Sequence, residues 1–192
     1  MRFAPFAIVA SVLAVGACAD TGVSTVGQVQ PWFRTADNGR ALNNRDVFVI
    51  VQGGGYGVDQ AAFRQAVLDG MQRYRAGMNT RFTSTPTTNY NSDYKVVMLF
   101  NGPVTAQAGE LCRNPERFGA MTPAASGETH VLAAFCQYDS PLTEVNGRAA
   151  GVTSVSDPRF GSLLRQTMTD LFPLVDERPD RDSGNDSGGD IP

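Results

Sequence analysis

The single histidine of the chain, His130, is the residue best suited to acid–base chemistry near neutral pH. Glu128 precedes it by two positions, and residues two apart on a β-strand point to the same side of the sheet, so the carboxylate could orient the imidazole. Hydrolysis also needs a nucleophile, and no serine lies in a Gly-x-Ser-x-Gly turn. Ser126 and Cys112 are the nearby candidates. We therefore expect a histidine without a catalytic role, and a small hydrolase built on His130 is the alternative.

A glycine-rich segment, Gly53–Gly57, lies between an apolar run and an amphipathic segment. A strand-to-helix connection of this kind can hold a phosphate on the free backbone N–H groups at the helix start. The segment matches neither the Gly-x-Gly-x-x-Gly pattern nor a P-loop, because no Lys-Ser or Lys-Thr follows it. Asp59 would also repel an anion there. A flexible connection is the expected role, and small-ligand binding by this loop is a second alternative.

Residues 1–18 combine one positive charge, Arg2, with an apolar run from Phe3 to Val15 and a Gly-Ala-Cys sequence that ends at Cys18. The run is shorter than the roughly 20 residues that a membrane-spanning helix needs, and has the length of a signal-peptide core. The segment resembles the signal peptide of bacterial lipoproteins, with Val15–Cys18 as the lipobox. The resemblance implies cleavage before Cys18, a diacylglycerol thioether on its sulfur, and an N-acyl chain such as palmitate. A plain secretory signal peptide is the alternative.

The same resemblance predicts a cellular location and, through it, a disulfide. Ala19 follows Cys18, where lipoproteins retained in the inner membrane of enterobacteria carry Asp, so we expect the outer membrane, facing the periplasm. That compartment is oxidising, and once Cys18 is set aside Cys112 and Cys136 remain as an even pair, which predicts a disulfide. It would close a loop of about 24 residues and stabilise by roughly 3 kcal/mol. Two buried thiols are the alternative. No metal site is expected, because these cysteines and His130 do not complete four ligands.

Charge excludes one class of partner. The formal net charge over 192 residues is -3, and much of it lies in an acidic tail rich in Gly and Ser after Val175, which leaves the body near neutral. Nucleic acid binding is not expected, because the chain has no basic stripe for a phosphate backbone. No cofactor is expected. The expected partners are the membrane, through the lipid anchor, and an unidentified protein of the envelope.

Hydrophobic periodicity predicts strands alternating with two main amphipathic helices. Asp59 begins the first helix as an N-cap, and Asp157-Pro158 begins the second, which Pro173 ends. The predicted strands are 47–51, 94–100 and 130–136, with shorter ones at 81–85 and 149–155; the predicted helices are 59–75, a short one at 106–112 and the last one from 157; and 144–147 is predicted as a turn.

This order of elements predicts an α/β two-layer sandwich, with a mixed sheet of about four or five strands and two main helices on one face. The predicted organisation is a signal peptide at 1–17, a lipid anchor and flexible tether at 18–45, the α/β domain at 46–175 and a disordered acidic tail at 176–192. A coil of about 20 residues in the tether would span roughly 25 Å. The expected function is non-enzymatic: a lipid-anchored envelope accessory with an assembly, transport or structural role.

Overall fold

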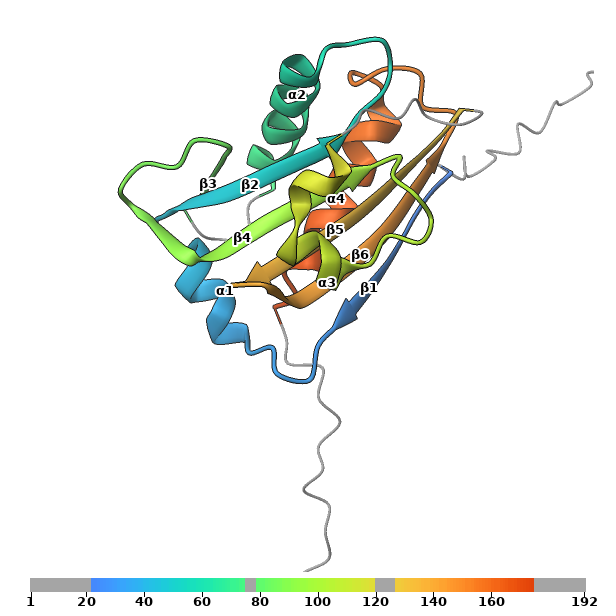
Figure 1. The fold of residues 1–192 in the computed structure, drawn as a ribbon. Coiled ribbons are helices and arrows are strands. Elements are labelled where there is room, and N and C mark those ends of the chain that lie inside the picture. The colour runs from blue at the N-terminus through green and yellow to red at the C-terminus, as the bar shows by residue number, and fades with distance from the viewer. Residues whose placement is uncertain (1–21, 75–78, 120–126, 175–192) are drawn as a thin grey trace, which may run out of the picture.

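The computed structural model describes residues 22–74, 79–119 and 127–174, which form a six-stranded mixed sheet with helices on both faces (Figure 1). The strands are β1 (Val23–Val29), β2 (Asp46–Gly53), β3 (Arg81–Thr83), β4 (Tyr90–Phe100), β5 (Glu128–Gln137) and β6 (Ser140–Ala150), in the spatial order β1-β6-β5-β4-β2-β3. The helices are α1 (Thr35–Leu42), α2 (Gln60–Gln72), α3 (Ala108–Arg113) and α4 (Pro158–Leu171), with a 3-10 helix, η1 (Pro115–Phe118).

The sheet is antiparallel across β1, β6, β5 and β4, and parallel across β4, β2 and β3. The α/β class and the mixed sheet are therefore confirmed. The sheet has six strands where four or five were predicted, because β1 completes one edge; β3, at the other edge, corresponds to the short strand predicted at 81–85.

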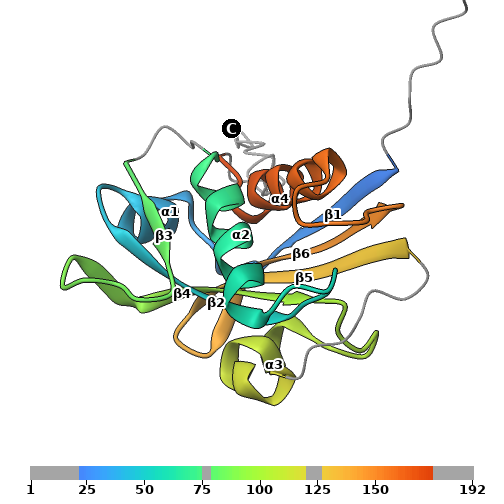
Figure 2. The same ribbon diagram turned by 90° about the horizontal axis from the view of Figure 1, so that it is seen from above.

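Helices cover the two faces unequally (Figure 2). The two main helices, α2 and α4, lie on one face together with α1, as predicted for the main pair, whereas α3 lies on the opposite face and adds a partial third layer. β4 and β5 run through the middle of the sheet and bury side chains on both faces. The larger core includes Phe63, Phe100, Phe135, Phe160, Leu163 and Phe172, and the smaller one includes Val97, Leu99, Leu111, Leu132 and Ala134.

The flexible tether predicted for residues 18–45 is wrong for its described part. All seven residues of β1 pair with β6, and the Thr25 hydroxyl donates a 2.5 Å hydrogen bond to Asp170 of α4. Phe33, just before α1, is only 3% exposed. An edge strand with a solvent-facing side needs few apolar residues, and β1 has three valines separated by Ser, Thr, Gly and Gln, a composition close to that of a coil.

The end of the sheet also differs from the prediction. β6 covers the segment 144–147, which the sequence predicts as a turn, and it ends at Ala150, before most of the strand predicted at 149–155. Gly147 lies inside the strand, and packing explains why this residue is a glycine. A Cβ at this position would be only 2.8 Å from Leu163 Cδ1 and 2.9 Å from Val131 Cγ1. The glycine thus permits the close approach of α4 to the sheet and does not mark a turn.

Both main helices begin where the sequence predicts. The carboxylate of Asp59 accepts a 2.7 Å hydrogen bond from the backbone N–H of Ala62. Asp157 accepts a 2.9 Å bond from the N–H of Arg159, and Pro158 occupies the first turn of α4. The predicted buried face of α4 is confirmed, with Phe160, Leu163, Leu164, Met168 and Leu171 at 1% exposure or less. The predicted signal peptide, Cys18 and the acidic tail lie outside the described residues.

Candidate functional site

The candidate site is a depression of about 440 Å³ where β4 ends and β5 begins. The loop after β4 forms one side of it, and the adjoining ends of β5 and β6 form the other. It has an apolar part that includes Leu99, Val104 and Leu132, and a polar part made by Asn101, His130, Asn146 and Arg148.

Asn101 connects the strands and loops of the site through hydrogen bonds. Its backbone has a positive φ of 52°, a conformation that asparagine tolerates better than most residues, and it is 8% exposed. Its N–H donates to the carbonyl of His130 at 2.9 Å, and its side-chain Oδ1 accepts from the His130 N–H at 3.0 Å. Its Nδ2 donates to the carbonyl of Gly54 at 2.8 Å. One buried side chain therefore joins the start of β5 to the glycine-rich loop. Sequence reasoning missed this role, and the only local signal was an Asn-Gly-Pro turn after a strand.

His130 and Glu128 lie together as predicted. The imidazole Nε2 is 3.1 Å from Glu128 Oε2, and both side chains are 41% exposed. The intervening residue, Thr129, is fully buried on the other face of the sheet, where its hydroxyl bonds to that of Tyr56. Of the two candidate nucleophiles, Ser126 lies outside the described residues and Cys112 is in a disulfide. His130 is therefore a solvent-exposed histidine whose ring is oriented by the Glu128 carboxylate.

Arg148 supplies positive charge beside this pair. It stands directly opposite His130 in the β5–β6 register, so both side chains project from the same face of the sheet. Arg148 is exposed, and it makes no ion pair with any residue in the described part of the chain.

The glycine-rich loop is packed into the fold. Gly53 has a φ of 73°, and a Cβ there would lie 1.9 Å from the carbonyl oxygen of Phe100, so only glycine allows this approach. Burial against the core raises the pKa of Tyr56, whose ring meets Phe160 edge to face at 5.9 Å. The Asp59 carboxylate occupies the start of α2, where a phosphate would have to bind. The expected flexible connection is instead tied down by Asn101 and Tyr56.

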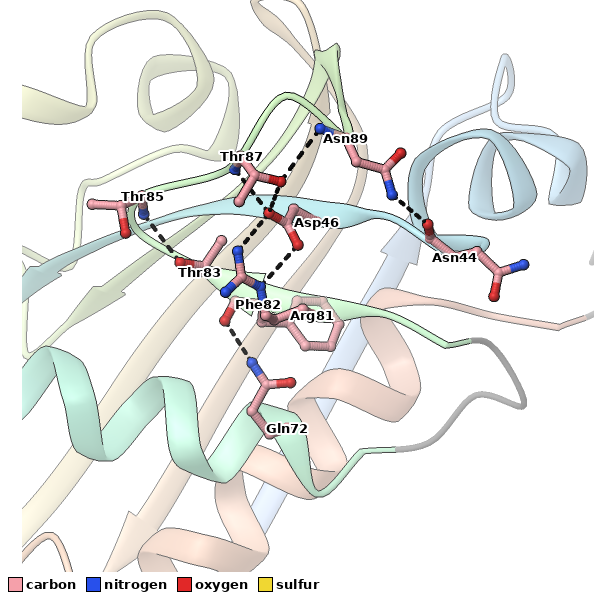
Figure 3. Close-up of polar contacts among 9 residues, drawn as sticks. All are labelled: Asn44, Asp46, Gln72, Arg81, Phe82, Thr83, Thr85, Thr87 and Asn89. Carbon is pink, nitrogen blue, oxygen red and sulfur yellow. Dashed lines mark hydrogen bonds and ion pairs between the residues drawn. The ribbon is translucent and has the colours of Figure 1, made fainter.

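A second polar cluster lies at the start of β2 and holds the parallel edge of the sheet together (Figure 3). Asp46, 8% exposed, accepts hydrogen bonds from Arg81 Nε at 2.9 Å and Nη2 at 2.7 Å. It also accepts from the N–H and the hydroxyl of Thr87, each at 2.8 Å. The Arg81 guanidinium and the Thr87 donors hold the pKa of Asp46 far below its usual value. All of these partners belong to β3 and the connection to β4, which indicates a structural role.

The predicted disulfide is confirmed. Cys112 and Cys136 are bonded, with their Cα atoms 5.8 Å apart, and both are fully buried. The bond joins α3 to β5 within the smaller core, which also contains Leu99 and Leu132 of the candidate site.

No group of three or more His, Cys, Asp or Glu side chains in residues 22–74, 79–119 and 127–174 is placed to hold a metal ion. Within the same ranges, none of the helices combines the length and apolarity that a membrane crossing requires.

Comparison with known proteins gives a partial likeness to solved structures. Neither a protein-family model nor a curated protein matches the sequence. Among solved structures, the PelC dodecamer from Paraburkholderia phytofirmans is similar in a P6 crystal and, as a point variant, in a C2 crystal. Identity is 12% in both cases, over 78% of this chain and 96% of that chain, with TM-scores of 0.42 and 0.41. What the structure itself defines is a class, an α/β domain with a six-stranded mixed sheet.

Proposed function

We propose that this protein is a lipid-anchored accessory of the bacterial envelope, held through Cys18 on the periplasmic side of the outer membrane, and that it acts through contacts rather than catalysis. The observation that carries the proposal is the Val15–Cys18 lipobox, which lies immediately before the fold. It is followed by no long linker, because β1 begins at Val23.

The distance between anchor and domain is short. Gly22 comes four positions after Cys18, and four residues span at most about 14 Å. This maximum distance between Cys18 and the fold is shorter than the roughly 25 Å that a coil over residues 25–45 would span. A lipid on Cys18 would therefore hold the sheet next to the bilayer, and partners would be met close to the membrane surface.

The chemistry around His130 supports contacts over catalysis. Catalytic groups commonly lie in sites that exclude water, whereas the side chains of His130 and Glu128 are each 41% exposed. The side chain of Asn101, which is buried beside the pair, makes structural hydrogen bonds to the backbone of His130 and Gly54.

The direct test is the mass of the mature N-terminus. Protein extracted in detergent from envelopes should begin at Cys18 and carry the added mass of a diacylglycerol and an acyl chain. Cys18→Ser should abolish that mass and release the protein from the membrane fraction. If the variant is processed and partitions like the native protein, the lipid anchor is refuted. Density-gradient separation of the two membranes tests the outer-membrane assignment.

A capture experiment tests the accessory role. Crosslinking native, anchored protein in whole envelopes should trap one recurrent partner. The matched control is the Cys18→Ser protein, which keeps the folded domain but loses its place at the membrane. Turnover of ester or cell-wall substrates by the purified protein, abolished by His130→Ala, would instead favour the hydrolase.

A further inference from the structure

Three loops at one end of the sheet contain no charged residue ahead of the aspartates that cap the helices after two of them. They are residues 53–58 after β2, 101–107 after β4 and 151–156 after β6; Asp59 and Asp157, which follow the first and the third, accept hydrogen bonds from the first turns of α2 and α4. These loops lie together, because the ends of β2 and β4 are in register at Gly53 and Phe100, and Asn101 bonds to Gly54. The third joins them through β5, since the N–H of Gly151 donates to the carbonyl of Gly127 at 2.6 Å. We call these three loops the uncharged end.

The opposite end of the sheet has a different character. Charged side chains surround the β5–β6 turn and the starts of β2 and β4: Arg34, Arg45, Asp93, Lys95 and Asp139. Each end of the sheet is built from loops that are far apart in the sequence, as the colours in Figure 1 show, so the difference in charge between the ends arises from the fold.

Val104 is the most exposed large hydrophobic residue of the uncharged end. It is 99% exposed at the tip of its loop, between Pro103 and Thr105, and no charge occurs from residue 96 to residue 109. Transfer of a fully exposed valine side chain from water to an apolar phase lowers its free energy. Its neighbours across the depression are His130 and Arg148.

Arg148, on β6 at the border of the uncharged end, is a cation that a ligand at this end could meet. Glu128 is bonded to His130, and Asp157 is paired with Arg159 at 2.8 Å. Arg148 has no ion-pair partner among the described residues, and its long side chain can reach a phosphate while its stem remains on the sheet.

The chain enters the fold at this same end. Gly22 accepts a 2.9 Å hydrogen bond from the N–H of Ala150, which leads directly into the third uncharged loop. Cys18 can lie no more than about 14 Å from Gly22. We infer that the uncharged end is a membrane-contact surface, with Val104 in the interfacial layer of the bilayer that holds the anchor and Arg148 against its phosphate headgroups. This inference rests on the proposed lipid anchor at Cys18.

Tryptophan fluorescence tests the inference, because the chain has a single tryptophan, Trp32, beyond the far end of β1. The six residue steps of β1 place it at least roughly 20 Å from the uncharged end. Lipidated full-length protein is reconstituted into phosphatidylcholine vesicles with brominated or ordinary acyl chains. The emission of Trp32 is compared with that of Val104→Trp and Val26→Trp, each made together with Trp32→Phe. Val26, 63% exposed halfway along β1, is the matched control.

Brominated chains should quench the emission of the Val104→Trp protein and leave the Trp32 and Val26→Trp proteins unchanged. In both kinds of vesicle the emission maximum of the Val104→Trp protein should lie to the blue of that of the Val26→Trp protein. Equal emission in both kinds of vesicle at position 104 overturns the inference and leaves that loop to a protein partner. Quenching of Trp32, or of all three proteins, also overturns it. The mass of Cys18 is measured on the same samples. A lipidated but unquenched protein refutes the membrane contact alone, whereas a protein without lipid refutes the proposed function and this inference with it.

Discussion

Replacing Asp46 with asparagine should destabilise the domain much more than the loss of an exposed ion pair would. The carboxylate is buried and accepts four hydrogen bonds, two from Arg81 and two from Thr87. The Asp46→Asn substitution removes the charge and leaves one side-chain oxygen to accept hydrogen bonds. Losing one partner of a buried pair costs about 3–5 kcal/mol.

The expected loss is smaller than that range because the partners can be hydrated. Arg81 has a side chain that is 55% exposed, and Thr87 is exposed as well. We therefore expect a loss of about 2–3 kcal/mol in the free energy of unfolding, the value of one or two hydrogen bonds to a charged group. For a domain of this size that corresponds to a fall of roughly 4–12 °C in Tm.

Urea denaturation followed by circular dichroism measures the effect. The control is Asp139→Asn, the same substitution in the 3.6 Å pair with Lys95, where Asp139 is 72% exposed. An exposed pair of this kind contributes about 0–1 kcal/mol. If Asp46→Asn and Asp139→Asn lower the free energy of unfolding equally, the structural role of the Asp46 cluster is refuted.

The effect should also depend on pH in a defined direction. The pKa of Asp46 is lowered in the folded protein, so the unfolded state binds its proton more readily. Its contribution is complete above the unfolded pKa of about 3.9 and is lost as the pH falls through the folded pKa. Asp157, whose pKa is lowered to about 2 by Arg159, follows the same sign. The difference between native and Asp46→Asn protein should therefore be constant from neutral pH to about pH 5 and shrink below pH 4.

Three further predictions concern the disulfide, the last helix and the histidine. Reducing the bond between Cys112 and Cys136 should lower the free energy of unfolding by roughly 3 kcal/mol, measured by denaturation with and without a reductant; an unchanged midpoint would contradict it. Leu164→Ala should cost about 2–5 kcal/mol, whereas deleting residues 178–192 should leave Tm nearly unchanged, and the reverse order in a melting experiment would refute the packing of α4. His130→Ala should retain function in cells if the fold survives, and a null phenotype with normal folding and localisation would favour the hydrolase.

Some of the fold follows from short stretches of sequence. The N-caps Asp59 and Asp157 hold the first turns of α2 and α4 through neighbouring N–H groups, so a few residues suffice to predict where these helices begin. The apolar runs of β2, β4 and β5 are readable for a related reason, since strands buried on both faces need hydrophobic side chains at nearly every position.

The edge of the sheet is not readable in this way, because its stability comes from distant partners. β1 is held by pairing with β6 and by the Thr25–Asp170 bond, and its own residues resemble those of a linker. Gly147 suggests a turn in the sequence, whereas its requirement for a small residue comes from Leu163 on α4. Local propensity has no access to either contact.

The candidate site divides in the same way. By itself the sequence determined that His130 could meet Glu128, since the period of a strand places residues two apart on one face, and it determined that Cys112 and Cys136 were the pair to bond. Only the tertiary structure brought Asn101, Gly54 and His130 together and gathered three uncharged loops beside the start of β1. The physical reason is the order of strands in the sheet, which sets which loops share an end and is decided by packing across the whole domain.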